Sequence, residues 1–226
     1  GCAGTGVIMS VNNSLYCKPV LDGGTDEMKS RWLTPFARGE KLGCFGLTEP
    51  MSGSDAQHMA TRAEKNGDHY ILRGQKNFIT NGPNAHAIVV FATTAQDAGA
   101  KGISAFVVPT DAKGCIIGAP DDKLGIRASQ SCTMTFDDCE VSESMRLGPE
   151  GAGFKIAMKT LDGGRIGIAA QAVGIARAAF EAARAWSLER KAFGKTISEH
   201  QAIQFKLADM ATEIDAARLL TWRAAH

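Results

Sequence analysis

The sequence lacks a strong charge of either sign, and it has no long apolar run. Its 226 residues include 25 Lys and Arg against 24 Asp and Glu, which gives a formal net charge of +1. This balance argues against nucleic acid or an anionic membrane as the main partner. No uninterrupted apolar run approaches the roughly 18 residues that a membrane-spanning helix needs. We therefore expect a soluble globular protein without membrane insertion.

Cys-x-x-Cys pairs are also missing, and no histidine lies at metal-ligand spacing from a cysteine. A chain of this size can build a core without disulfides, so we expect most thiols to be buried in a reducing compartment. The sequence thus predicts neither a disulfide framework nor a metal site. The six cysteines are Cys2, Cys17, Cys44, Cys115, Cys132 and Cys139.

The common nucleotide and hydrolase motifs are absent as well. Glycines at 1, 4 and 6 and at 148, 151 and 153 have the order G-x-x-G-x-G, which differs from the Rossmann G-x-G-x-x-G. Neither group follows a strand into a βαβ unit. There is no Walker A loop, H-E-x-x-H or G-x-S-x-G motif. Interpretations as a nicotinamide enzyme, an ATPase or a common hydrolase therefore lose most of their support.

Three compositional regions indicate an α+β multidomain protein. Residues 1–40 predict helix and connector, as the end of an N-terminal helical domain. Residues 41–146 alternate short β-rich runs with turn residues, which favours a central antiparallel barrel or sandwich over a parallel sheet. Residues 147–226 are helical in pattern and predict the start of a C-terminal helical domain.

Individual elements can be placed within these regions. A first helix is expected at Glu27–Phe36, and a long Ala-rich helix is expected from Gly151 to about Arg190, where Gly194 ends it. Ser198 and Gln201 have the spacing of a capping box that begins the next helix. The expected strands are Gly43–Thr48, Tyr70–Arg73, Ala87–Thr93, Ile103–Pro109 and Cys132–Phe136. The expected turns are Asn66–Gly67, Asn81–Gly82, Lys113–Gly114 and Asp137–Asp138.

The two ends of the chain suggest an internal piece of a longer protein. The sequence begins at Gly1 without an initiator Met or a targeting pattern. It ends within the helical pattern of Ala216–Ala225, where no Gly, Pro or capping residue stops the helix. We expect motifs to be missing for this reason, and we expect these 226 residues alone to be inactive.

The most unusual segment runs from Phe45 to Asp55 and reads FGLTEPMSGSD. A strand leads into Pro50 and then into a Ser/Gly loop with hydroxyl groups and backbone amides. Such a loop can hold a phosphate or the edge of a flavin, because oriented amides form an anion-binding nest. A β-bulge followed by an ordinary turn uses the same residue types, and from the residues alone this alternative stays open.

Five blocks, in order and in register, resemble the acyl-CoA dehydrogenases, which are flavoenzymes with a helical–β–helical fold. The wording of Gly6–Ser14 and Gln204–Met210 is most similar to the short-chain (butyryl) branch of that family. The five blocks are Leu47–Asp55, Phe78–Asn81, Asp122–Arg127, Asp162–Arg165, and Arg190–Gly194 with Gln201 and Leu207–Met210.

The resemblance implies FAD as the cofactor and assigns roles to the matching residues. The FAD contacts of one subunit would be Phe45, Leu47, Thr48, Gly53, Ser54, Phe78, Ile79 and Thr80. Those reaching the FAD of a neighbouring subunit would be Arg190, Phe193 and Gln201, which implies a homo-oligomer, in the family usually a tetramer. Ser54, Asp162 and Arg165 would contact the acyl-CoA substrate. Taken singly, Phe78 and Phe193 could be core residues, Arg190 a helix C-terminal cation and Gln201 a cap.

Two departures from the family pattern bear on the chemistry. The small residues that usually follow the loop are replaced here by Ala56-Gln57-His58. Gly164 stands where the isovaleryl and long-chain branches carry their catalytic Glu. The resemblance therefore implies a base located C-terminal to His226, and it assigns no catalytic residue within the chain. We interpret Glu49 as a structural carboxylate.

The implied reaction is the α,β-dehydrogenation of a short-chain acyl-CoA to the trans-2-enoyl-CoA. Electrons would pass to electron-transferring flavoprotein, in the bacterial cytoplasm or the mitochondrial matrix. An acyl-CoA oxidase or flavin monooxygenase of the same fold is the first alternative. A catalytically silent family member that acts as a binding partner is the second.

Overall fold

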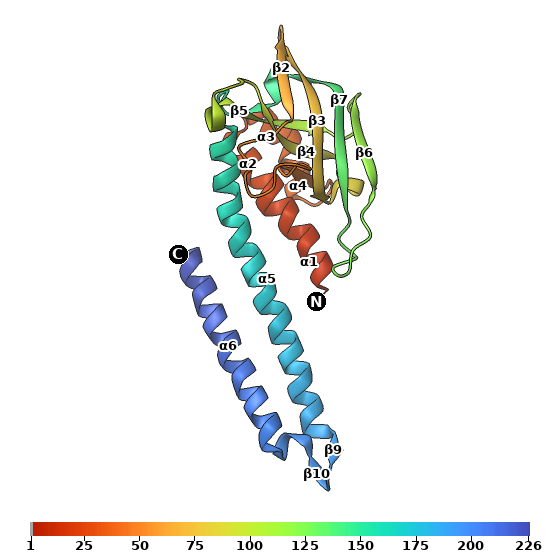
Figure 1. Cartoon of the computed structure of the whole chain (residues 1–226), viewed down its shortest axis with the longest axis vertical. Helices are drawn as coiled ribbons and strands as arrows, with labels where there is room; N and C mark the ends of the chain where they lie inside the picture. The colour runs from red at the N-terminus through yellow and green to blue at the C-terminus, as the bar shows by residue number, and fades with distance from the viewer. Residues whose placement is uncertain (1) are drawn as a thin grey trace. The chain divides into compact units, whose positions relative to one another are not determined.

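The computed structural model describes residues 2–226, and the chain divides into two compact units, Gly1–Gly164 and Arg165–His226. The first unit opens with a helical rod in which α1 (Ala3–Ser10), the π-helix η1 (Val11–Cys17) and α2 (Lys18–Gly23) follow without a break. Figure 1 shows this rod in red, followed by the short helices α3 (Asp26–Trp32) and α4 (Thr34–Ala37). The expected helical start of the chain is thus present.

The expected single helix at Glu27–Phe36 is wrong, because it breaks at Leu33. Thr25 begins α3 by accepting a hydrogen bond from the Met28 amide at 3.3 Å. Pro35 has no amide hydrogen to continue the helical hydrogen bonds of α3, and its ring crowds the carbonyl four residues earlier, so the chain restarts as α4 with proline in the first turn. Proline therefore decided a boundary that the hydrophobic spacing alone did not reveal.

Eight strands of the first unit form one mixed sheet in the order β6-β7-β3-β2-β4-β5-β8, with β1 paired to β4. The long strands β3, β7 and β6 lie side by side in Figure 1. This central sheet with flanking helices confirms the α+β architecture. The strands are β1 (Gly43–Gly46), β2 (Arg62–Asn66), β3 (His69–Thr80), β4 (Ala87–Thr93), β5 (Ile103–Pro109), β6 (Cys115–Pro120), β7 (Ser131–Ser142) and β8 (Arg146–Leu147).

The core lies on both faces of β4 and β5, which are buried almost throughout. Odd-numbered β4 residues such as Val89 and Phe91 pack against a helical cluster that includes Tyr16 and Phe36. Even-numbered residues such as Val90 pack against the inward faces of β3 and β7. This alternation follows from the two-residue period of a strand, and it explains why both strands read as continuous apolar runs.

Several expectations about the sheet need correction. The sheet is not wholly antiparallel, because β1 pairs with β4 in parallel, Gly43 opposite Ala87. The pairing of β3 with β7 extends both strands well beyond the expected Tyr70–Arg73 and Cys132–Phe136. Asp137–Asp138 is a β-bulge inside β7 and not a turn, since the register shifts there and Asp138 has φ 49°. Strands β2 and β6 were not expected at all.

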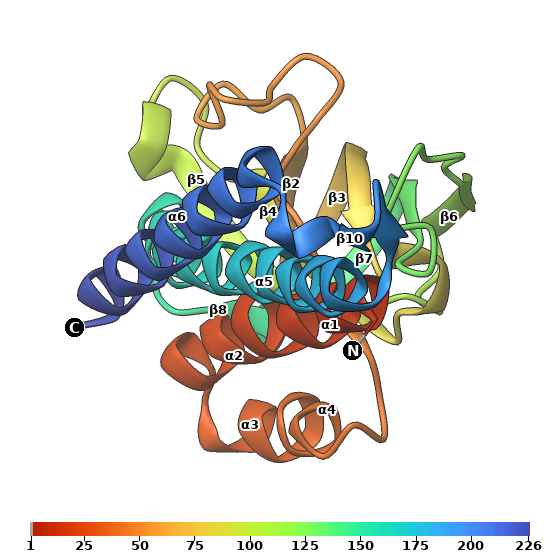
Figure 2. The ribbon, with the colours of Figure 1, turned by 90° about the horizontal axis from the view of Figure 1, so that it is seen from below.

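The second unit holds most of α5 (Gly153–Glu189), a small hairpin and α6 (Gln201–Ala225). Its two helices lie side by side in both views (Figures 1 and 2). The hairpin pairs β9 (Lys191–Ala192) with β10 (Lys195–Thr196). Phe193 and Gly194, with φ 54° and 80°, form its two-residue turn.

The expected capping box at Ser198 and Gln201 is wrong by a few residues. The reciprocal pair is Thr196 with Glu199, whose carboxylate accepts from the Thr196 amide at 3.0 Å. It begins the 3₁₀ turn η5 (Ile197–Glu199), and α6 follows from Gln201.

By length and composition, α5 could cross a membrane, although a core helix of a soluble domain passes the same test.

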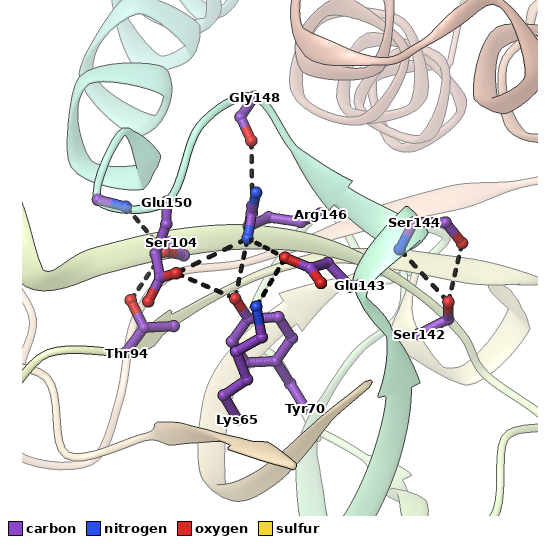
Figure 3. Close-up of polar contacts among 11 residues, drawn as sticks. Lys65, Tyr70, Thr94, Ser104, Ser142, Glu143, Ser144, Arg146, Gly148 and Glu150 are labelled. Carbon is purple, nitrogen blue, oxygen red and sulfur yellow. Dashed lines mark hydrogen bonds and ion pairs between the residues drawn. The ribbon is translucent and has the colours of Figure 1, made fainter. Parts of the chain in front are cut away.

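A polar cluster holds the segment before α5 against the sheet (Figure 3). The Arg146 guanidinium donates to the Tyr70 hydroxyl at 2.8 Å and to the Glu143 carboxylate at 3.1 Å. Its Nε donates to the Gly148 carbonyl at 3.2 Å, and the Tyr70 hydroxyl donates to Glu150 at 3.2 Å. The cluster therefore joins β3, β8 and the loop that leads into α5.

Candidate functional site

The loop after β1 is a compact structure held by a buried carboxylate. The Glu49 amide donates to the Ser52 carbonyl at 2.9 Å, and the Ser52 amide donates back to Glu49 at 3.2 Å. The Ser52 hydroxyl donates to the Asp55 carbonyl at 2.8 Å. These bonds leave Gly53 and Ser54 as exposed residues at the tip of the loop.

Glu49 and Lys76 form an ion pair that is buried in the sheet. The Lys76 Nζ atom lies 2.7 Å from Glu49 Oε1, and the two side chains are 0% and 3% exposed. The carboxylate also accepts from the amides of Ala60 at 2.5 Å and Thr61 at 3.0 Å. The ammonium group makes a further bond to the Leu47 carbonyl at 3.2 Å. Both charges are thereby hydrogen-bonded, as buried charges must be.

The environment shifts the pKa of both partners. Burial, opposed in part by the Glu49 charge, lowers the pKa of Lys76 to about 8. Burial alone would raise the pKa of Glu49, but the Lys76 charge and the hydrogen bonds from Lys76, Thr61 and Ala60 together hold it below its ordinary value. Glu49 is therefore ionised at neutral pH, and all its contacts are structural.

The end of β3 carries a strained bulge beside this pair. Between Lys76 and Ile79 the register with β7 shifts, and Phe78 takes a left-handed φ of 58°. Its ring is 72% exposed, while the next residue, Ile79, is buried. The Asn77 amide donates to the Thr48 carbonyl at 2.8 Å. A left-handed aromatic residue costs free energy, and such strain gathers at functional sites.

Asn81 closes the bulge from the far side. Its side-chain amide donates to the carbonyls of Ile8 and Gly43, each at 3.2 Å. Its backbone amide donates to the Gln130 carbonyl at 2.9 Å. Asn81 has a φ of 69°, which its short polar side chain tolerates better than most residues do. The expected Asn81–Gly82 turn is thus an anchor that joins α1, β1 and the loop before β7.

The structure brings together most of the first group of expected cofactor residues. Thr48 lies against Asn77, so the segments 45–48 and 77–80 are neighbours, with Phe45, Thr48 and Thr80 half-buried and Leu47 and Ile79 buried. The hydroxyls of Thr48 and Thr80 have no hydrogen-bond partner among residues 2–226. An exposed aromatic ring, unengaged hydroxyls and nearby amides fit the ring of a flavin, which takes both stacking and hydrogen bonds.

The other expected residues lie on α5 and in the second unit. Asp162 and Arg165 are on α5, three residues apart and therefore on one side of the helix. The β9–β10 hairpin lies between Arg190 and Gln201 in the chain and carries Phe193 in its turn. All three residues are exposed, Phe193 to 97%. Phe193 is thus not a core residue of the second unit. The roles of all these residues remain predictions.

Lys76 and Asn77 are functional candidates that the sequence interpretation missed. A signal for Lys76 was present, because inward residues of β3 alternate through Leu72, Gly74 and Lys76. A lysine at an inward strand position requires a buried anion as partner. No local pattern identified Glu49, which lies 27 residues away, as that anion.

No metal site is evident in the described part of the chain. Among residues 2–226, no three His, Cys, Asp or Glu side chains gather where they could hold a metal ion. Burial raises the pKa of Cys44 well above its ordinary value and that of Cys139 to about 11, so these thiols are protonated at neutral pH. All six cysteines are free.

Comparison with known proteins adds three relatives. A mitochondrial short-chain specific acyl-CoA dehydrogenase from Bos taurus is 55% identical over 225 residues, which cover 100% of this chain and 55% of that protein. A chain from structural work on the electron transferring flavoprotein of Acidaminococcus fermentans is 51% identical, with a TM-score of 0.96 over 98% of this chain and 58% of that one. A glutaryl-CoA dehydrogenase from Mycobacterium smegmatis in complex with FADH2 is 36% identical, with a TM-score of 0.89 over 95% of this chain and 54% of that one.

Family models account for nearly all of the sequence. Residues 1–40 match the acyl-CoA dehydrogenase N-terminal domain, residues 44–139 the middle domain and residues 151–226 the C-terminal domain. The chain spans about half the length of the curated relatives it matches. Three consecutive domain models and the shared fold show that the chain belongs to the acyl-CoA dehydrogenase family, whose members are FAD-dependent oxidoreductases.

Proposed function

We propose that this chain belongs to an enzyme that converts a short-chain acyl-CoA to the trans-2-enoyl-CoA. The observation that carries the proposal is the juxtaposition of Thr48 with the strained Asn77–Thr80 bulge and its exposed Phe78 ring. The 55% identity to a short-chain enzyme supports the choice of substrate class.

The residues of the first unit would bind and orient the flavin. Phe78 offers exposed apolar surface to the ring, while the hydroxyls of Thr48 and Thr80 offer hydrogen bonds to its polar edge. The exposed amides of Gly53 and Ser54 suit a phosphate oxygen. Bound FAD supplies the hydride acceptor for the substrate β-carbon.

The substrate would be bound on α5. Arg165 is a cation that suits the phosphates or carbonyl groups of an acyl-CoA, and Asp162 accepts hydrogen bonds from an amide or hydroxyl of the pantetheine arm. A water-excluded pocket strengthens hydrogen bonds to the thioester oxygen as enolate character develops. Arg165 and Asp162 would bind and orient the substrate, and neither needs to transfer a proton.

The base that removes the α-proton lies outside this chain in our proposal. Glu49 cannot serve, because its carboxylate is buried and bonded to Lys76, Ala60 and Thr61. The other family position for a carboxylate is occupied by Gly164, which has no side chain. A desolvated carboxylate from the remainder of the protein would have the raised pKa that this proton transfer requires.

The proposed assembly is a homo-oligomer, to be tested as a tetramer, in which Arg190, Phe193 and Gln201 reach the FAD of a neighbouring subunit. The exposed Phe193 ring in the two-residue turn of the β9–β10 hairpin supports this role. Electron-transferring flavoprotein is the proposed acceptor, supported by the similarity to a chain from work on that flavoprotein. A mitochondrial relative and bacterial relatives support either compartment.

The test uses the full-length protein that contains this chain. Anaerobic addition of butyryl-CoA should bleach the flavin, and subsequent air should reoxidise it slowly. Rapid peroxide formation would instead indicate an oxidase. A full-length protein that binds FAD but shows no bleaching with butyryl-CoA or longer acyl-CoAs would contradict the proposed function.

A further inference from the structure

We propose that the buried Lys76–Glu49 pair is a positioning device, which holds the Leu47–Thr48 backbone and the Asn77–Thr80 bulge in the geometry that flavin contact requires. Neither side chain would touch the flavin. This inference rests on the proposed function and adds to it a pair of residues that act through their neighbours.

The geometry of the bonds carries the first step. Hydrogen bonds join two consecutive residues of β3 to the three consecutive residues Leu47–Glu49, which follow β1. Lys76 Nζ bonds the Leu47 carbonyl at 3.2 Å and the Glu49 carboxylate at 2.7 Å, and the Asn77 amide bonds the Thr48 carbonyl at 2.8 Å. β1 pairs in the sheet with β4 and not with β3, so these bonds replace a strand ladder at this point.

The second step is the anchoring of the loop. Glu49 accepts from the amides of Ala60 and Thr61, which end the loop that carries Gly53 and Ser54. One carboxylate therefore fixes both ends of the loop and its distance from β3. A Cβ atom on Gly46 would stand 2.7 Å from Ile88 Cδ1 and 3.3 Å from Lys76 Cγ, so the glycine leaves room for both side chains.

The third step concerns charge. An ion pair buried this deeply gives little net stability, since desolvation offsets most of the attraction, whereas removal of one partner leaves an unpaired buried charge. A well-packed apolar pair would serve stability as well. What an apolar pair cannot supply is a set of directed bonds to the Leu47 carbonyl and to two amides.

The variants Glu49→Gln, Lys76→Met and the double variant are made in the full-length protein. The double variant is included because it leaves no unpaired buried charge and is the one expected to fold. Its matched control is Glu64→Gln with Arg73→Met, which removes the exposed Glu64–Arg73 pair at 2.6 Å between β2 and β3, together with the Arg73 contact to the exposed Asp138. The readouts are FAD dissociation constant, the visible circular dichroism of bound FAD, and hydrogen exchange of the Asn77 amide in the apoprotein.

We expect the folded Glu49/Lys76 double variant to bind FAD at least about tenfold more weakly, with an altered flavin dichroism and faster Asn77 exchange, because small displacements of contact groups are costly. The control should stay within about twofold of wild type. A folded double variant with wild-type affinity, dichroism and exchange would overturn the proposal. If the wild type itself binds no FAD, the proposed function fails, and unchanged Asn77 exchange in the double variant then overturns the positioning role separately.

Discussion

A methyl carbon of Leu15 lies 2.8 Å from the position that a Cβ atom would take on Gly164. Gly163, its neighbour on α5, has nothing within 4 Å of the same position. Close packing against Leu15 therefore accounts for Gly164 within the first unit. Gly163 has no packing reason among the described residues.

This contrast predicts opposite effects of two alanine substitutions. Gly163→Ala should stabilise the protein by up to about 1 kcal/mol, because alanine favours helix more than glycine does. Gly164→Ala should be less stable than Gly163→Ala by about 1–3 kcal/mol, because the new methyl group overpacks against Leu15. Denaturant unfolding of the full-length protein measures both. Leu15→Ala combined with Gly164→Ala should recover part of the loss, and strict additivity in this cycle would contradict the contact.

Arg146 should be needed to hold the segment that leads into α5. Arg146→Ala should destabilise the protein by about 1–3 kcal/mol, because the substitution removes bonds to Tyr70, Glu143 and the Gly148 carbonyl. Arg177→Ala, which breaks an exposed pair with Glu181 on α5, is the control and should cost less than about 0.5 kcal/mol. Equal unfolding midpoints for the two variants would argue against the cluster.

Glu49 should make stability depend on acid pH. Burial acts to raise the pKa of Glu49. The Lys76 charge and the hydrogen bonds from Lys76, Thr61 and Ala60 together hold this pKa below the ordinary 4.5. A lowered folded-state pKa means that the stabilisation is complete above about pH 4.5 and is lost as the pH falls through the folded-state value. Unfolding of Glu49→Gln between pH 3 and 7 should therefore show a shallower acid decline than wild type. Parallel curves for Glu49→Gln and wild type would contradict the shift.

Phe193 should separate stability from FAD binding. Its φ of 54° is unfavourable for phenylalanine and better suited to asparagine, so Phe193→Asn should leave the hairpin as stable as wild type or stabilise it by about 1 kcal/mol. The same change should weaken FAD binding in the full-length oligomer, because the exposed ring is lost. Thermal unfolding of the apoprotein and FAD titration measure the two effects, and unchanged FAD affinity would remove Phe193 from the proposed neighbouring-subunit contact.

Local patterns predicted much of the fold. The bounds of β4 and β5 were predicted correctly, because continuous apolar runs between turn residues admit little else. The bounds of β3 and β7 were not, since their length comes from pairing with each other. β6 consists of exposed and half-buried residues, so its sequence shows no alternation of apolar and polar residues that would indicate a strand. The domain boundaries at residues 40 and 146 remain predictions.

The sequence by itself determined the family, through motifs whose residue types and order can be compared directly. It also predicted the residues of the proposed flavin contact, which lie within short contiguous blocks. Only the tertiary structure decided that Lys76 is buried and that Glu49, 27 residues earlier, is its partner. The physical reason is that a buried charge must find its counterion in space, and chain folding brings together groups that no local period relates.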